Sequence, residues 1–399
     1  MDSAKLELLE RTTDQIMPVQ SISSLAQSKK KLRIKYGVDV TAPFLHIGHA
    51  VNLWQMRHLQ DLGHKVVFLI GDFTTRIGDP TGKSQTRPEI PLGEIEKNAE
   101  EFIKQVKKIV RTEEDVFEVR RNSEWYGNMP LSEFLGLLSQ VTYGHLIQRD
   151  MFQKRIREGQ EIRMHELVYP LLQGYDSYML NSDLTIIGSD QLFNENMGRY
   201  YQQKFGQNPQ AIITTRITPG LDGKNKQSKS LNNYIALEDT PRNKFGKIMS
   251  LPDELIISYF EVYTERTNAQ IQEFKNALDQ GANPSEIKKQ LGFALVERYH
   301  GTEAAQAELD WFNQTFSQRA RPQNIPSLQI AFEASAMDIV KSAIPSQSNN
   351  QIRRLFEQGA VRINDQKISN PTEKPAIKKG DVLKVGKTTF YELIPPGNE

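Results

Sequence analysis

Two histidines and a glycine stand close together near the start of this 399-residue chain, and their types suit phosphate binding. His46, Gly48 and His49 follow residues 32–38, which read as a buried strand, and they open a helical pattern. Free N–H groups and the dipole at a helix N-terminus favour anions. Imidazoles donate to phosphate oxygens, and Gly48, which has no Cβ, lets a flat base approach the backbone. Two solvated histidines at a helix start are the alternative.

A second cluster lies far downstream in a glycine-containing loop, residues 221–230, which ends in Lys226-Gln227-Ser228-Lys229-Ser230. At this spacing the two lysines can close over a triphosphate and neutralise charge that develops on it. A solvated basic loop is the alternative. The two clusters together predict a triphosphate site, at which His46, His49, Lys226 and Lys229 are the candidate catalytic residues.

The elements that must position these clusters read as an α/β domain with a parallel sheet. Residues 1–31 read as one or two helices that lead into the strand at 32–38. Residues 65–71 are continuously apolar, which is typical of a parallel strand covered on both faces. Further buried strands are expected at 183–188 and 210–216. Ligands of such sheets bind beyond the carboxyl ends of the strands.

Polar side chains occur where these strands end. Asp79 follows the second strand and suits a ligand ammonium, with an Asx-turn before Pro80 as the alternative. Asp190 suits ribose hydroxyls and Gln191 the backbone of an amino acid, with a plain polar turn as the alternative.

A phenol, an amide and a carboxylate share one face of the helix expected over residues 165–180. Tyr169, Gln173 and Asp176 are spaced i, i+4 and i+7. The neighbouring positions are apolar, so we interpret this polar face as a pocket wall rather than as a core face. A surface helix with a half-buried tyrosine is the alternative.

Composition limits the class of protein. The chain is 38% hydrophobic and 25% charged, as globular proteins are, and its net charge of +1 gives no global attraction to nucleic acid. No apolar run is long enough to cross a membrane, and no membrane association is expected. Cysteine is absent, which excludes disulfides and favours the cytoplasm. The acidic, amphipathic N-terminus reads as an ordinary helix rather than a signal peptide.

In these sequence segments, and over nearly its whole length, the chain resembles the bacterial tyrosyl-tRNA synthetases, a family of class I aminoacyl-tRNA synthetases. The resemblance is carried by GVDVTAPFLHIGHA, LIGDFTTRIGDPTGKSQTRP, YPLLQGYDS, GSDQLFN and LDGKNKQSKSLNNYI. It implies ATP-dependent activation of L-tyrosine, transfer to tRNA(Tyr), and a homodimer. It also implies Mg²⁺ on the departing pyrophosphate but no metal site held by the protein.

The resemblance implies three domains. Residues 1–235 would form a Rossmann-like catalytic domain with an insertion at about 113–182 that supplies dimer contacts. Residues 236–325 would form an all-helical anticodon-binding domain. Residues 333–396 would form a small α+β RNA-binding domain of the ribosomal small-subunit-protein type. Its basic residues Arg353, Arg354 and Arg362 suit an RNA backbone, although charge alone equally fits a solvated module.

By position, the resemblance also implies a role for each site residue. Asp39 and Thr41 would lie at the adenylate, together with the ATP-binding residues His46, Gly48, His49, Asp190, Lys226 and Lys229. Asp79, Tyr169 and Gln173 would hold the substrate ammonium, Gln191 the carboxyl region, and Asp176 the phenol. A site that hydrogen-bonds a hydroxyl leaves its own polar groups unpaired when the hydroxyl is missing, so Asp176 would reject phenylalanine.

Several positions depart from the family pattern. Lys35 stands where many members have a tyrosine that binds the substrate phenol, and Thr75-Arg76 replaces a glycine and an apolar residue. The other departures are Val38, Val40, Ile187 and Gln227. They leave open a paralogue that acts on a tyrosine analogue or on tryptophan. A non-catalytic RNA-binding paralogue is the third alternative, against which the intact histidines and lysines argue.

Overall fold

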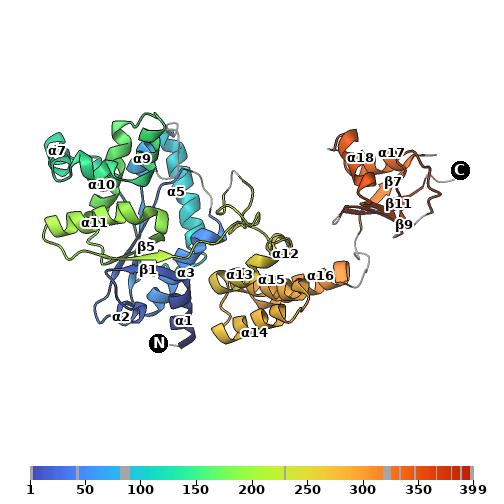
Figure 1. The fold of residues 1–399 in the computed structure, drawn as a ribbon, viewed down its shortest axis with the longest axis horizontal. Helices are drawn as coiled ribbons and strands as arrows, with labels where there is room; N and C mark the ends of the chain where they lie inside the picture. The colour runs from blue at the N-terminus through green and yellow to red at the C-terminus, as the bar shows by residue number, and fades with distance from the viewer. Residues whose placement is uncertain are drawn as a thin grey trace. The chain divides into compact units, whose positions relative to one another are not determined.

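The computed structural model describes residues 3–41, 45–80, 90–228, 231–317, 325–331, 334–345, 347–364, 366–378, 380–386 and 389–395. The chain folds as two compact units, Met1–Leu309 and Asp310–Glu399 (Figure 1). Each unit has its own β-sheet and its own hydrophobic core.

The described part of the first unit contains a six-stranded sheet in the order β1-β6-β5-β2-β3-β4. Neighbouring strands are parallel except β1 and β6, which are antiparallel. The strands are β1 (Thr13–Met17), β2 (Arg33–Val38), β3 (Lys65–Ile70), β4 (Phe117–Arg121), β5 (Leu184–Gly188) and β6 (Ala211–Thr215). The predicted α/β class with a parallel sheet is confirmed.

The strand β1 is a correction to the sequence analysis, which expected only helices before β2. Its side chains are half-buried or exposed, because it lies at the edge of the sheet. Its pairing with β6 joins residues about 200 positions apart, such as Met17 and Ile212. Local periodicity carries no signal for a short edge strand whose only partner is so distant.

Helices cover both faces of the sheet, which explains the continuous apolar run of β3. Val66, Phe68 and Ile70 belong to one buried cluster, with α3 (Ile47–Asp61) and α5 (Leu92–Val106). Val67 and Leu69 point to the opposite cluster, with α10 (Met164–Met179) and α11 (Leu192–Lys204). Successive side chains of a strand alternate between faces, so burial on both sides requires apolar residues throughout.

Shorter helices complete the first unit. They are α1 (Ser3–Thr12), α2 (Ile22–Ala26), α4 (Asp72–Ile77), α6 (Ser123–Tyr126), α7 (Leu131–Ser139), α8 (Tyr143–Ile147), α9 (Asp150–Arg157) and η1 (Ser189–Gln191). The region after the lysine loop is helical, with α12 (Pro241–Met249), η2 (Asp253–Leu255), α13 (Ile256–Tyr263), α14 (Asn268–Asp279) and α15 (Pro284–His300). The next helix, α16 (Thr302–Phe312), crosses the boundary between the two units, and η3 (Asn313–Ser317) belongs to the second unit.

The helices that follow residue 235 pack directly on the sheet domain. Phe260 of α13 and Leu291 of α15 lie in the same buried cluster as Leu53 of α3. The core is therefore continuous across the expected boundary at 235/236, and a separate anticodon-binding role for this region stays a prediction. Similarly, the expected insertion at 113–182 supplies β4, which pairs with β3 at one edge of the sheet.

The described part of the second unit is a small α+β fold. Its sheet has the order β7-β11-β10-β8-β9, and helices α17 (Ala336–Ala343) and α18 (Asn349–Glu357) share its core. The strands are β7 (Ser327–Gln329), β8 (Val361–Ile363), β9 (Gln366–Lys367), β10 (Asp381–Val385) and β11 (Thr389–Ile394). In the parts of the chain that the structure describes, no helix is long and apolar enough to span a bilayer.

The close contact of α10 with α11 supports a stability prediction. At Gly174 of α10, a Cβ would lie 2.7 Å from the Cβ of Met197 on α11. Gly174→Ala therefore overpacks a buried contact and should lower the free energy of unfolding by about 1–3 kcal/mol. Thermal unfolding followed by circular dichroism should show a loss of several degrees in Tm. Gly136→Ala in α7 is the matched control, since nothing lies within 4 Å of its Cβ position; an equal loss in both variants would contradict the packing argument.

Candidate functional site

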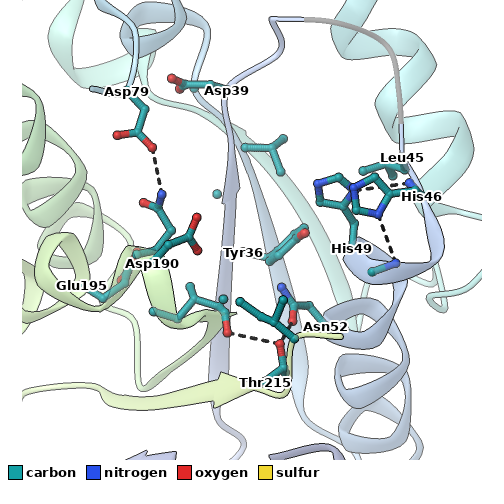
Figure 2. A pocket seen from close by; sticks show the side chains of 18 of the residues that line it. Tyr36, Asp39, Leu45, His46, His49, Asn52, Asp79, Asp190, Glu195 and Thr215 are labelled. Atoms are coloured by element: carbon teal, nitrogen blue, oxygen red, sulfur yellow. Dashed lines mark hydrogen bonds between the residues drawn. The ribbon is translucent and has the colours of Figure 1, made fainter. Parts of the chain in front are cut away.

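A cavity of about 590 Å³ opens at the carboxyl ends of β2 and β5, where α/β sheets bind ligands. The predicted residues that line it are Asp39, Thr41, His46, Gly48, His49, Asp79, Tyr169, Gln173, Asp176, Asp190, Gln191 and Lys226. Figure 2 shows several of these side chains around the cavity. Lys229 lies outside the described residues. One cavity therefore joins residues that are far apart in the sequence.

The backbone holds the two histidines at the N-terminus of α3. His46 Nδ1 accepts from the backbone N–H of Gly48 at 3.1 Å, and His49 Nδ1 accepts from that of His46 at 3.3 Å. The two rings lie side by side with centroids 3.8 Å apart (Figure 2). Each imidazole thus satisfies an N–H group that the first helical turn leaves unpaired.

These bonds also decide where each ring carries its proton. Burial lowers the pKa of His46 to about 2 and that of His49 to about 4, so both rings are neutral near pH 7. A neutral imidazole that accepts at Nδ1 carries its proton on Nε2. Each histidine therefore has one Nε2–H donor, which is the group that a phosphate oxygen needs.

The structure gives Gly48 a purpose in addition to the one predicted. A Cβ at this position would lie 2.9 Å from Cε1 and Nδ1 of the His46 imidazole. The missing side chain makes room for the ring of His46, which must lie over the Gly48 N–H to accept from it. Hence Gly48 shapes the histidine pair, and the approach of a flat base to its backbone stays a prediction.

Backbone hydrogen bonds join the segment that follows the lysine loop to the histidine segment. The N–H of Ile47 donates to the carbonyl of Ile235 at 3.0 Å, and the N–H of Leu237 donates to that of Leu45 at 3.0 Å. In the loop itself, Lys226 extends its ammonium toward η1, where Nζ lies 3.5 Å from Asp190 Oδ2. His46, His49 and Lys226 therefore line the same cavity.

Gln227, one of the residues that depart from the family pattern, anchors this loop. Its Nε2 donates to the hydroxyl of Tyr263 at 2.9 Å, and its Oε1 accepts from the N–H of Ile235 at 3.3 Å. The amide therefore holds this segment with two hydrogen bonds, while the neighbouring Lys226 lines the cavity.

At the other end of the cavity the Asp176 carboxylate is almost fully buried. Its Oδ1 accepts from the indole N–H of Trp125 at 3.0 Å, and its Oδ2 accepts from Asn122 Nδ2 at 3.3 Å. Burial raises its pKa to about 7, against the opposing effects of the Lys35 ammonium and these hydrogen bonds. Sequence reasoning missed Trp125 and Asn122, because only the pairing of β4 beside β3 brings them here.

A second acidic group, Asp39, is held by two hydroxyls. Tyr169 donates to its Oδ2 at 3.0 Å and Thr74 to its Oδ1 at 2.8 Å. Burial and the neighbouring carboxylate raise the pKa of Tyr169 well above its usual value, so this phenol keeps its proton. Nearby, Asp79 Oδ2 accepts from Gln191 Nε2 at 2.8 Å (Figure 2).

The two unusual residues after β3 lie outside the cavity lining. Thr75 is buried, and its hydroxyl donates to the carbonyl of Gly71 at 2.6 Å and accepts from the N–H of Val40 at 2.9 Å. Arg76 is exposed and does not line the cavity. The pair therefore supports the loop and does not reshape the described pocket.

Lys35 stands where many family members have a tyrosine that binds the substrate phenol. Here the side-chain ammonium is instead paired within the protein. Lys35 Nζ lies 2.9 Å from Glu195 Oε2 and donates to Ser177 Oγ at 2.7 Å. Sequence reasoning missed Glu195, although it follows Gln191 at i+4 and so shares its helix face.

The predicted RNA-binding arginines lie in the second unit. Arg353 and Arg354 are exposed on α18, and Arg362 is exposed on β8. Arg362 pairs directly with Lys384 of β10 and with Lys367 of β9. Because directly paired residues of antiparallel strands point to the same face, this unit presents a row of three basic residues.

Comparison with known proteins finds relatives that match this chain over nearly its full length. The family model for class I tRNA synthetases (W and Y) matches residues 27–317. The tyrosine–tRNA ligase of Francisella tularensis subsp. tularensis is 41% identical over 389 residues, covering 98% of either chain. That of Thermotoga maritima is 38% identical over 392 residues, covering 98% of this chain and 97% of its own.

Solved structures share the fold at lower identity. A C-terminally truncated mitochondrial tyrosyl-tRNA synthetase from Aspergillus nidulans superimposes with a TM-score of 0.65 at 23% identity, over 79% of this chain and 95% of its own. The tyrosyl-tRNA synthetase of Archaeoglobus fulgidus, complexed with L-tyrosine, gives a TM-score of 0.58 at 20% identity, over 77% of this chain and 99% of its own.

Proposed function

Since the chain belongs to the class I tRNA synthetases of the tryptophan and tyrosine group, we propose that it activates L-tyrosine with ATP and transfers it to the 3′ end of tRNA(Tyr) in protein synthesis. The observation that carries this proposal is the layout of one cavity. The paired neutral histidines and Lys226 lie at one end, and a buried carboxylate lies at the other. The first end suits a triphosphate and the second a phenol.

In this proposal the substrate supplies its own nucleophile. The tyrosine carboxylate attacks the α-phosphate of ATP; a carboxyl O–P bond forms, the bond to the bridging oxygen breaks, and pyrophosphate leaves. The Nε2–H groups of His46 and His49, together with Lys226 and Lys229, stabilise the charge on the phosphates. Catalysis is then positioning and electrostatic stabilisation, without a general base.

In this proposal Mg²⁺ binds together with ATP, because Mg²⁺ prefers hard oxygen ligands such as those of the phosphates. Among the residues that the structure describes, no group of three or more His, Asp or Glu side chains is arranged to hold a metal. Its chemistry would be to shield the pyrophosphate as negative charge builds on it.

Recognition of tyrosine is assigned to the inner end of the cavity. Asp176 accepts a hydrogen bond from the phenol, and its donors Trp125 and Asn122 keep its oxygens oriented. Asp79, Tyr169 and Gln173 hold the ammonium. The position of this carboxylate favours tyrosine over tryptophan. The phenol O–H can donate to it, whereas the N–H of an indole ring lies at a different position on the ring.

The remaining proposals concern partners. The basic row of the second unit supports contact with the tRNA backbone. A homodimer is supported by exposed apolar side chains in the 113–182 region, where Leu131 is 72% and Met164 73% exposed. The proposed place of action is the cytoplasm, because charged tRNA is used there.

The decisive experiment is ATP–pyrophosphate exchange with tyrosine, tryptophan and phenylalanine, followed by aminoacylation of tRNA. We expect exchange with tyrosine and transfer to tRNA(Tyr). Exchange with tryptophan alone would replace the proposed substrate, and tRNA binding without exchange would favour the non-catalytic alternative.

The preference for tyrosine should depend on pH. With a pKa of about 7, Asp176 is ionised to roughly one tenth at pH 6 and nine tenths at pH 8. The ionised form is the stronger acceptor, so the ratio of kcat/KM for tyrosine to that for phenylalanine should rise several-fold between these values. Exchange kinetics with both amino acids measure it. In Asp176→Asn the ratio should not change with pH, and an equal pH dependence in this variant would assign the titration to another group.

A further inference from the structure

A buried ion pair lies at the inner end of the cavity and has a structural cost. Lys35 and Glu195 are 1% and 2% exposed, with Nζ and Oε2 2.9 Å apart. Lys35 Nζ also reaches Ser177 Oγ at 2.7 Å and the carbonyl of Gln173 at 3.4 Å, so the ammonium has three acceptors. Burying two charges costs several kcal/mol, and such pairs add little net stability. Stability alone therefore does not account for this buried pair.

The second carboxylate oxygen of Glu195 controls a pocket residue. Its Oε1 accepts from Gln173 Nε2 at 2.8 Å, and its Oε2 accepts from Gln210 Nε2 at 2.9 Å as well as facing Lys35. An ionised carboxylate only accepts hydrogen bonds. The Gln173 amide must therefore turn its NH₂ group toward Glu195, which leaves its carbonyl oxygen on the other side.

A chain of amides continues from this contact to Asp79. Asn194 Nδ2 donates to Gln173 Oε1 and to Gln191 Oε1, each at 2.9 Å, and Gln191 Nε2 donates to Asp79 Oδ2 at 2.8 Å. A carboxylate at each end of the chain decides which way all three amides point. Gln173 lines the cavity and keeps a second lone pair on Oε1, which suits a substrate ammonium.

We propose that Glu195 is a positioning residue: by holding the Gln173 NH₂ group, it makes this wall of the pocket offer an acceptor to the substrate ammonium. Lys35 balances the charge of Glu195. The close packing of α10 on α11, seen at Gly174 and Met197, keeps the two side chains within reach. The proposal rests on the proposed tyrosine-activating function, in which Gln173 binds the ammonium.

The variant Glu195→Gln tests this orientation with almost no change in volume. Lys35 and Gln210 both donate to the Oε2 position, so the new amide keeps its oxygen there and turns its NH₂ group toward Gln173. Gln173 must then invert and present its own NH₂ group to the ammonium. We expect affinity for tyrosine to fall about 10- to 100-fold. Affinity for 3-(4-hydroxyphenyl)propanoate, which lacks only the ammonium, should be unchanged.

Two double variants separate positioning from folding. Lys35→Met with Glu195→Gln removes both buried charges and should lose the ammonium preference equally, because Gln210 still orients the new amide. Gln173→Glu with Glu195→Gln moves the carboxylate to the pocket wall and should restore the preference. Glu166→Gln is the matched control, since it breaks the buried pair of Glu166 with Arg155, at 2.7 Å, outside the cavity lining.

Affinities are measured by calorimetry or fluorescence titration on the full chain. Equal losses for tyrosine and the propanoate, or no loss for either, would overturn the proposal and make Glu195 a structural residue. Failure of the unsubstituted protein to bind tyrosine or to support exchange would instead refute the proposed function, so the two failures are distinguishable.

Discussion

Replacement of His49 by alanine is expected to lower the rate of tyrosyl-adenylate formation about 100-fold, the usual cost of removing one preorganised donor to developing charge. The ring is neutral and its Nδ1 is occupied by the His46 N–H, so its only available donor is Nε2–H. Because the lost bond is directed at the phosphates, affinity for tyrosine should change little. Single-turnover adenylate formation, with the tyrosine affinity measured separately, gives both quantities.

Two further variants make this test specific. His49→Gln keeps an N–H donor and should lose less activity than the alanine variant. His58→Ala is the control on the same helix, because His58 is buried in α3 but does not line the cavity. A loss in His49→Ala that appears mainly as weaker tyrosine binding would contradict a role at the phosphates.

Replacement of Asp176 by alanine is expected to reduce discrimination between tyrosine and phenylalanine by about 10- to 100-fold, the energetic range of a hydrogen bond to a charged group. In the protein, phenylalanine would leave the buried Asp176 carboxylate without the phenol partner. Once the carboxylate is gone, neither amino acid carries that penalty. Trp125 and Asn122 lose their shared acceptor, so some stability should also be lost.

The measurement is the ratio of kcat/KM for the two amino acids in pyrophosphate exchange. The maximal rate with saturating tyrosine should fall less than the ratio, since the carboxylate lies away from the phosphates. Discrimination that survives the substitution would show that another group reads the phenol.

Much of the fold was predictable because its signals are local. The strands β2, β3, β5 and β6 lie where they were expected, and parallel strands bring their carboxyl ends to one edge. This topology explains why residues as distant as His49 and Asp190 line a single cavity. The edge strand β1 was not predictable in the same way, because its partner β6 is remote in the sequence.

The site shows the same division between local and distant effects. The spacing of Tyr169, Gln173 and Asp176 predicts their common face, since helical periodicity is a property of one segment. Which atom each side chain offers depends on neighbours from other segments. Glu195 decides the direction of the Gln173 amide, and Trp125 holds the carboxylate of Asp176.

Residue types and their periodicity are enough to predict the kinds of chemical groups in this site and the helices and strands that carry them. Both properties are local, and they suffice to predict a phosphate end and a phenol end. The protonation of the histidines, the partner of Lys35 and the orientation of the pocket amides follow only from the folded arrangement of the chain. These depend on burial and on hydrogen bonds between distant segments, which exist only once the chain has folded.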